Sequence, residues 1–336
     1  MKKIILFLSF MFILSGCVKN SNSNIVEEIN KKIENSKNYQ MTGTLQIFRN
    51  EENFTYDIVS TYKKGDYFKV QLTNKKNNHE QIILKDKESV YVLTPSLNKS
   101  FKFQSDWPYN NSQIYLLQPI IKDIKNDKES KVEKTKEGYT IISNVNYSSE
   151  KDFKKQKIYL DLEKNIVKVE VLDDKQNIKM CLDVINIEYD TKIEENLFDI
   201  NKYYNSTDTE EPKETLSNEN NKATNSLEEI VYPMYVPTDT YLTGQDVVNT
   251  AAGERVILTF DGESQFTIIQ ENLQQVNGTN YVYGDPYLIL DTIGTVTDYS
   301  VSWISDGIEY SVLSNTMSID ELLTVAQSIS VKPVGK

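Results

Sequence analysis

The cysteine at position 17 is the residue whose surroundings most clearly specify a chemistry. The basic pair Lys2-Lys3 is followed by an apolar run over residues 4–14, which is shorter than the roughly 20 apolar residues of a membrane-spanning helix. The run closes with Leu14-Ser15-Gly16-Cys17, in which small residues suit a peptidase and the thiol can accept a diacylglyceryl group. We therefore predict that signal peptidase II cleaves between Gly16 and Cys17. Residues 1–16 are then a lipoprotein signal peptide, and Cys17 becomes the lipidated mature N-terminus.

This lipidation would anchor the chain to a membrane. Each buried CH₂ of an acyl chain such as palmitate contributes about 0.8 kcal/mol, so two or three chains form a stable anchor. An ordinary secretory signal with an accidental cysteine is the alternative. The expected localisation is the extracytoplasmic face of the cell membrane, where residues 17–24 form a short tether.

The remaining candidates for chemistry are few. His79 is the only histidine, and its polar neighbours indicate a solvated strand edge rather than a catalytic base. Cys181 lies in the alternating run 179–184, where a small buried hydrophobe is the common explanation. It has no partner for an intramolecular disulfide once Cys17 carries lipid. Zinc requires several Cys or His ligands, so we predict no metal and no cofactor.

Paired carboxylates are also present. They are Glu27-Glu28, Glu51-Glu52 and Asp173-Asp174, which fall in expected helix faces and turns. Solvation explains them there, although the sequence alone leaves a glycosidase pair open. We predict that the protein is not an enzyme and has no catalytic residue.

The distribution of charge locates a boundary in the chain. Residues 18–205 contain 30 basic and 29 acidic side chains, whereas residues 206–336 contain 5 and 20. Between these parts, residues 205–228 are rich in Asn, Thr, Glu, Ser and Lys, a composition that cannot bury enough surface to offset its ordering entropy. We predict a disordered linker over 205–228, one domain over 25–204 and a small acidic domain over 229–336. Nucleic acid is excluded as a partner by this charge and by export.

Hydrophobic periodicity predicts the elements of the first domain. Val26, Ile29 and Ile33 share one helix face. Period-two runs then predict antiparallel strands, with turns at Lys64-Gly65-Asp66 and similar sites. The strands are expected at 41–48, 55–62, 67–72, 81–84, 90–93, 138–143, 157–162, 167–172 and 178–189. A helix is expected over 114–124, kinked or divided by Pro119. The sheet must bury one face against these helices.

The acidic domain is predicted to contain two hairpins and a helix. Strands at 255–260 and 265–271 flank Asp261-Gly262, and strands at 299–304 and 309–313 flank Asp306-Gly307. Ser318-Ile319-Asp320-Glu321 fits a capping box that opens a C-terminal helix. We therefore predict an α+β fold, mainly β: a curved antiparallel sheet plugged by helices, followed by a small antiparallel β domain with a C-terminal helix.

Several segments resemble known proteins. Ile158-Tyr159-Leu160-Asp161, the run 166–171 and Asn196-Leu197-Phe198-Asp199-Ile200 are similar to the final strands of the LolA/LolB lipoprotein-carrier superfamily. The segment 91–100 and the region from Trp107-Pro108 to Pro119 resemble the germination lipoproteins of the GerS type from spore-forming anaerobes. The resemblance covers roughly residues 25–204. The acidic domain resembles small domains of sporulation lipoproteins and of some anti-sigma regulators.

This resemblance implies a fold, one favoured role and two alternative roles. The superfamily implies an open half-barrel whose apolar concave face holds an acyl lipid in the carriers. The GerS type implies a non-catalytic accessory or docking factor of spore cortex maturation or germination, which acts between the spore membranes with a cell-wall amidase or another exported protein. The first alternative is a lipid or lipoprotein carrier or sensor that uses the concave face. The second is a regulatory lipoprotein that contacts an anti-sigma factor.

Overall fold

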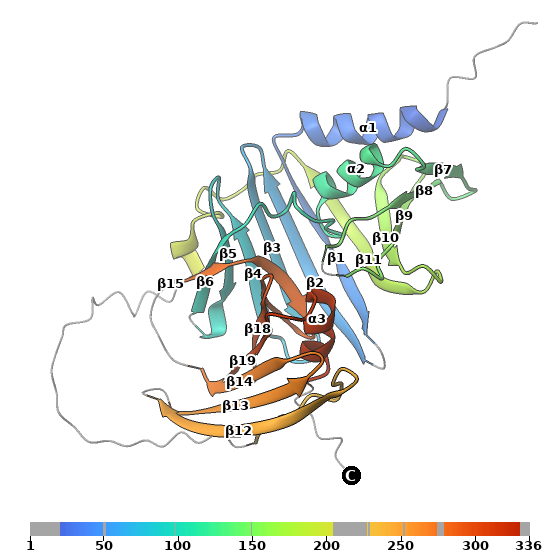
Figure 1. The fold of residues 1–336 in the computed structure, drawn as a ribbon. Helices are drawn as coiled ribbons and strands as arrows, with labels where there is room; N and C mark the ends of the chain where they lie inside the picture. Colours follow the sequence, from blue (N-terminus) through green and yellow to red (C-terminus); the bar gives the residue numbers. More distant parts are fainter. Residues whose placement is uncertain are drawn as a thin grey trace, which may run out of the picture.

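A computed structural model describes residues 21–49, 52–97, 99–148, 150–203, 227, 229–250, 253–273 and 279–329. In these residues the chain forms two open sheets and three α-helices (Figure 1). The predicted fold class, mainly β with a few helices, is confirmed. None of the helices in the described ranges is long and apolar enough to cross a membrane.

The first sheet contains twelve strands, eleven of them from the N-terminal part of the chain. In order across the sheet, the strands are β15 (Thr279–Tyr283), β6 (Lys99–Gln104), β5 (Val90–Thr94), β4 (Glu80–Lys85), β3 (Tyr67–Asn74), β2 (Glu52–Lys63), β1 (Asn38–Arg49), β11 (Ile178–Tyr189), β10 (Ile166–Leu172), β9 (Lys155–Leu160), β8 (Tyr139–Asn144) and β7 (Lys131–Lys134). All neighbours are antiparallel except β15 and β6, which run parallel. Strands β6 and β7 were not predicted, because their alternation is short and rich in lysine.

Strand β1 alternates because only one of its faces is buried. Along β1, Tyr39, Met41, Gly43, Leu45 and Ile47 are buried, while the polar residues between them are half-buried. The buried set defines the concave face of the sheet. Trp107 packs into the same core, at 1 % exposure. The concave face is therefore the structural centre of the N-terminal part.

Two helices cover one end of the concave face (Figure 1). Helix α1 (Ser21–Asn35) places Ile25, Ile29 and Ile33 against the core, and residues 21–24 of the predicted tether belong to it. Helix α2 (Leu117–Asn126) packs beside it.

The prediction that Pro119 kinks or divides its helix is wrong. Helix α2 begins at Leu117, so Pro119 lies in the first turn, where its missing N–H has no intrahelical partner to lose. A residue of strand β1 fixes where α2 starts. The Tyr39 hydroxyl accepts a hydrogen bond from the Leu117 backbone N–H at 3.2 Å and donates one to Gln118 Oε1 at 2.8 Å.

The outer face of the first sheet is partly covered by the segment after β11. Phe198 packs there against Ile82, Leu84 and Leu93, and the short 3₁₀ helices η1 (Pro95–Leu97) and η2 (Ile200–Tyr203) belong to this part of the fold. The residues Asn196 to Ile200, which carry part of the family resemblance, therefore cover the back of the sheet.

The second sheet contains seven antiparallel strands from the C-terminal part. Their order is β12 (Thr240–Thr250), β13 (Gly253–Gly262), β14 (Phe266–Asn272), β19 (Ile308–Leu313), β18 (Ser300–Ser305), β17 (Thr292–Val296) and β16 (Asp285–Ile289). Both predicted hairpins are present, but in the first Asp261 and Gly262 belong to β13 and pair with Tyr241 and Thr240, so the connection to β14 is residues 263–265. At the second, Asp306 and Gly307 have φ of 48° and 78°, which a two-residue hairpin turn with positive φ requires.

The C-terminal helix α3 (Ile319–Gln327) begins as predicted. The Ser318 hydroxyl accepts a hydrogen bond from the Glu321 backbone N–H, and the Glu321 carboxylate accepts one from the Ser318 backbone N–H, which completes the capping box. Leu322, Leu323 and Ala326 then pack into the core of the second sheet. The capping sequence therefore fixes where this helix starts.

Candidate functional site

The candidate site is the junction between the two parts of the chain, on the concave face of the first sheet. Ile293 of β17 belongs to the buried core of the first sheet, and Val282 and Leu288 pack against that core. Strand β15, contributed by the C-terminal part, also extends the first sheet beside β6. The C-terminal part therefore covers the portion of the concave face that α1 and α2 leave open (Figure 1).

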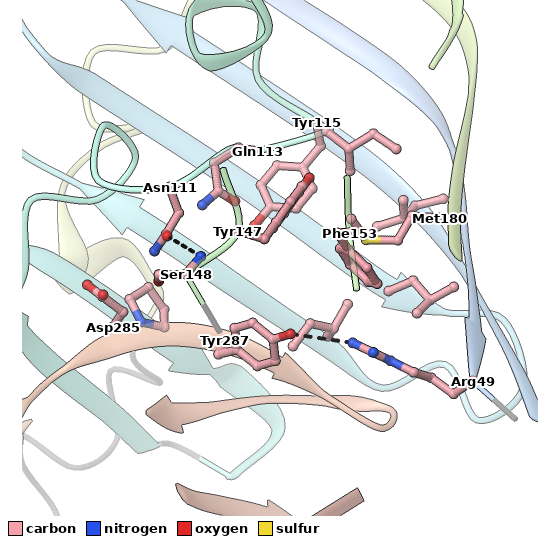
Figure 2. A pocket seen from close by; sticks show the side chains of 15 residues that line it. Arg49, Asn111, Gln113, Tyr115, Tyr147, Ser148, Phe153, Met180, Asp285 and Tyr287 are labelled. Atoms are coloured by element: carbon pink, nitrogen blue, oxygen red, sulfur yellow. Dashed lines mark hydrogen bonds between the residues drawn. The ribbon is translucent and has the colours of Figure 1, made fainter. Parts of the chain in front are cut away.

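A small cavity remains between the two parts (Figure 2). Its volume is about 60 Å³, and its walls come from β1, β11, β16 and the loops around Asn111 and Ser148. Leu45, Ile47 and Leu288 are among its apolar lining residues. Figure 2 shows Arg49 and Asp285 at opposite ends of it. The cavity is an apolar chamber with one charged group at each end.

Arg49 lies at one end of the cavity in a buried polar cluster. Its guanidinium is 2.5 Å from the Glu150 carboxylate, with 16 % and 13 % of the two side chains exposed. The Tyr287 hydroxyl donates to the same Glu150 oxygen, and Arg49 donates to Tyr287 Oη at 3.5 Å. Gln327 Nε2 of α3 completes the cluster at 3.4 Å from Glu150. One carboxylate thus contacts both parts of the chain.

The pKa values in this cluster favour a fixed ion pair. Burial, reinforced by the Glu150 charge, raises the pKa of Tyr287 well above its usual value, so its hydroxyl stays protonated and can donate. Burial alone would lower the pKa of Arg49, but Tyr287 and Glu150 outweigh burial and raise it. The cluster offers neither an activated nucleophile nor a free base, and its geometry suits structural attachment.

The side-chain amide of Gln81 attaches the two parts of the chain at a second point, where it forms hydrogen bonds with a backbone N–H and C=O as a neighbouring strand would. Its side-chain oxygen accepts from the Ile293 N–H at 2.5 Å and from Thr292 Oγ1 at 3.2 Å, and its Nε2 donates to the Ile293 carbonyl at 3.3 Å. Gln81 is 7 % exposed and Ile293 is 5 % exposed. The amide of one residue therefore satisfies both backbone polar groups of a buried residue in the other part.

Further polar contacts surround these two attachments. Asp285 accepts hydrogen bonds from Ser105 Oγ and from Asn110 Nδ2, the latter at 2.7 Å. Lys99 on β6 forms a 3.0 Å ion pair with Glu309 on β19, and the lysine side chain is 7 % exposed. These contacts reach the C-terminal part from several strands and loops. The junction is thus a broad, specific interface.

The structure also locates the residues singled out by sequence. Cys17 lies outside the described residues, so its lipidation stays a prediction. Cys181 is buried at 4 % exposure, and burial raises the pKa of its thiol to about 11, which disfavours the reactive thiolate. His79 is half-buried in the turn between β3 and β4.

The pairs Glu27-Glu28 and Asp173-Asp174 lie on different elements, and Glu51 of the third pair lies outside the described residues. Glu27 is exposed on α1 in an ion pair with Lys31, and Asp173 accepts backbone hydrogen bonds within its own turn. Within the described ranges, no group of three or more His, Cys, Asp or Glu side chains is arranged to hold a metal ion.

Sequence reasoning missed the residues of the junction. Arg49, Glu150 and Tyr287 are each at least 101 positions apart along the chain, and no local motif connects them. One signal was present: Arg49 and Arg255 are the only arginines among 37 basic residues. Each forms a short ion pair with a glutamate, which is the role for which arginine's planar donor group is suited.

Fold and junction together define a protein with a curved, open antiparallel sheet whose concave face is covered by helices and a second β domain. A LolA superfamily protein from Nitrosomonas europaea matches 54 % of this chain and 98 % of its own, with 11 % identity and a TM-score of 0.32. A chain in the complex of the Clostridioides difficile CwlD amidase with the GerS lipoprotein matches 56 % and 99 %, with 20 % identity and a TM-score of 0.31. A chain of the Pseudomonas aeruginosa MucA/MucB complex matches 91 % and 98 %, with 12 % identity and a TM-score of 0.33.

Sequence comparison finds a relative that is similar over nearly the whole chain. The sporulation protein YdcC of Bacillus subtilis (strain 168) is 31 % identical over 328 residues, which are 95 % of this chain and 93 % of the relative. The chain therefore belongs to the family of this sporulation protein. No family model matches it. The resemblances to the LolA superfamily and to the GerS complex that the sequence predicted are both found among the solved structures.

Proposed function

We propose that this protein is a non-catalytic lipoprotein, anchored through Cys17 on the extracytoplasmic face of the membrane, that docks an exported partner during spore cortex maturation or germination. A cell-wall amidase is the partner that we favour. The observation that carries the proposal is the 31 % identity, over nearly the whole chain, to a protein named for sporulation. The role that the two proteins share is then a function of both domains together.

The filled concave face supports docking over lipid carriage. Helices α1 and α2 and the C-terminal domain occupy the concavity and leave separate cavities of about 60 and 130 Å³, whereas ligand pockets usually measure roughly 300–1,000 Å³. An acyl chain would have to displace the buried contacts of Gln81 and Arg49. Native mass spectrometry of the delipidated, signal-less chain tests this point, and a co-purifying lipid would support carriage instead. The regulatory role toward an anti-sigma factor stays a prediction from sequence.

Deletion of the gene in the native host tests the proposed function. We expect spores with altered cortex muropeptides and slow germination, and we expect full restoration by the wild-type gene. A chain in which residues 1–17 are replaced by the cleavable signal peptide of a secreted protein should restore less, because an unanchored protein is diluted away from its membrane-adjacent partner. Spores that germinate normally with an unchanged cortex would contradict the proposal.

A further inference from the structure

The second sheet ends in a long edge strand, β12, with one side unpaired in the described part of the chain. Strand β12 is the terminal strand of its sheet, and it pairs with β13 from Thr240 to Thr250. It lies at the opposite end of the molecule from α1, at the bottom of Figure 1. An edge of this kind presents a row of backbone N–H and C=O groups that can pair with another chain.

The side chains of this edge are unusually apolar for a solvent-facing strand. Tyr241, Leu242, Val247 and Val248 are 65 %, 44 %, 50 % and 44 % exposed. Proteins normally protect long edge strands with several charges or a proline, but Asp246 is the only charged residue of β12. An irregularity in register between Leu242 and Gly244 interrupts the edge, and residues 245–249 beyond it form the regular part that is open to pairing.

The segment before β12 enlarges this apolar surface. Tyr232 and Met234 are 45 % and 86 % exposed, and the Tyr232 hydroxyl donates to Gln245 Oε1 at 2.6 Å, which holds the segment beside the strand. We call Tyr232, Met234, Tyr241, Leu242, Val247 and Val248 the edge patch. Because the side chains of a strand alternate, Leu242 and Val247 lie on one face of the sheet and Tyr241 and Val248 on the other. A strand added at this edge would therefore meet apolar side chains on both faces.

The charge around the edge patch restricts what can bind it. Asp239, Asp246, Glu254 and Asp261 lie on or beside β12 and β13. Arg255 is the only basic residue of the C-terminal domain within the described ranges, and Glu271 already binds it at 2.7 Å. A second copy of this acidic edge and an anionic lipid surface would both be repelled. A basic partner would be attracted.

We propose that β12 is a docking strand that pairs with an extended segment of an exported partner protein, a segment with alternating apolar residues and flanking Lys or Arg side chains. Backbone hydrogen bonds supply the affinity of such strand addition, and the edge patch and the carboxylates supply the specificity. The inference rests on the proposed docking function and assigns the surface that performs it. The position of β12 far from α1 directs the partner away from the anchored end.

Photocrosslinking in cells that express the full chain tests the inference. We would introduce p-benzoylphenylalanine at Val248 and, as the control, at Leu162, which is 65 % exposed in the turn between β9 and β10. Mass spectrometry then identifies the attached peptide. We expect an adduct at Val248 to a basic, extended segment of an exported protein, and none at Leu162.

A charge-reversed variant provides the second measurement. Asp246→Lys with Glu254→Lys should lower the yield of that adduct by about tenfold, because like charges then face the partner. Asp174→Lys, an exposed change in the other domain, should leave the yield unchanged. Unaltered thermal unfolding of the purified variants shows that they fold.

Three results overturn the inference: no adduct at Val248, equal adducts at Val248 and Leu162, or an adduct to a second copy of the chain. A defective deletion strain combined with any of these results rejects only the docking strand. A deletion strain with normal spores rejects the proposed function itself.

Discussion

Arg49 at the end of β1 and Glu150 in the loop before β9 form a buried ion pair. Both residues belong to the N-terminal part of the chain, but Glu150 also bonds side chains of the C-terminal domain. The two side chains are 2.5 Å apart, and Glu150 also accepts hydrogen bonds from Tyr287 of β16 and Gln327 of α3. Such a pair gains little net stability over an apolar pair, but it penalises every arrangement that leaves one charge alone. The cluster therefore specifies how the C-terminal domain sits on the concave face.

Replacing Glu150 with Ala should destabilise the protein strongly. The change leaves the Arg49 guanidinium buried without a counter-charge, a situation that costs about 3–5 kcal/mol. Urea unfolding followed by tryptophan fluorescence measures the loss. Lys31→Ala is the control, because the exposed Lys31–Glu27 pair contributes less than about 1 kcal/mol. Equal effects of the two variants would show that the cluster does not hold the domains.

Gln81→Leu should loosen the junction at a different point. Leucine fits the space but leaves the buried N–H and C=O of Ile293 without partners, and each unsatisfied group costs about 1–3 kcal/mol. We expect faster amide hydrogen exchange at Ile293 and along β17. Gln40→Leu is the matched control, since Gln40 bonds Thr61 within the first sheet. Unchanged exchange at β17 in Gln81→Leu would remove this residue from the junction.

Asp123 on α2 should make stability depend on pH. Burial raises the pKa of this carboxyl to about 6, so the folded state binds its proton more tightly than the unfolded chain does. The stabilisation is therefore complete below a pH of about 4 and is lost as the pH rises to about 6. Asp123→Asn should be more stable than wild type at pH 7 and should show a flatter profile between pH 4 and 6. Thermal unfolding across that range measures both, and parallel profiles would contradict the assignment.

Much of the fold follows from local patterns. Strand β1 was predictable because alternate residues such as Met41 and Leu45 face one core, and β18 with β19 because Asp306-Gly307 accepts the positive φ of a tight turn. Helix α3 was predictable from the Ser318 to Glu321 capping box. In each case the determining residues lie within a few positions of one another.

The junction was not predictable, because its determinants are distant in sequence. Helix α2 starts where the Leu117 N–H donates a hydrogen bond to Tyr39 of strand β1. That start puts Pro119 in the first turn, where it does not disturb the helix. Strand β15 exists through pairing with β6, far earlier in the chain. The attachment by Gln81 requires a buried backbone from the other domain, so a polar residue within a strand gave no local sign of its role.

Lipidation of Cys17 is the prediction on which the membrane location depends. Growth with an alkyne-labelled fatty acid should label the wild-type chain and should leave Cys17→Ala unlabelled, because the thiol is the site of diacylglyceryl transfer. Cys181→Ser is the control: Cys181 is buried within β11, so its loss should not change labelling. The Cys17→Ala chain should also retain residues 1–16, since signal peptidase II acts on the lipidated cysteine, and intact-mass measurement detects this. Labelling that persists in Cys17→Ala would place the anchor elsewhere, and the direction that we assign to β12, away from the membrane, would then have to be abandoned.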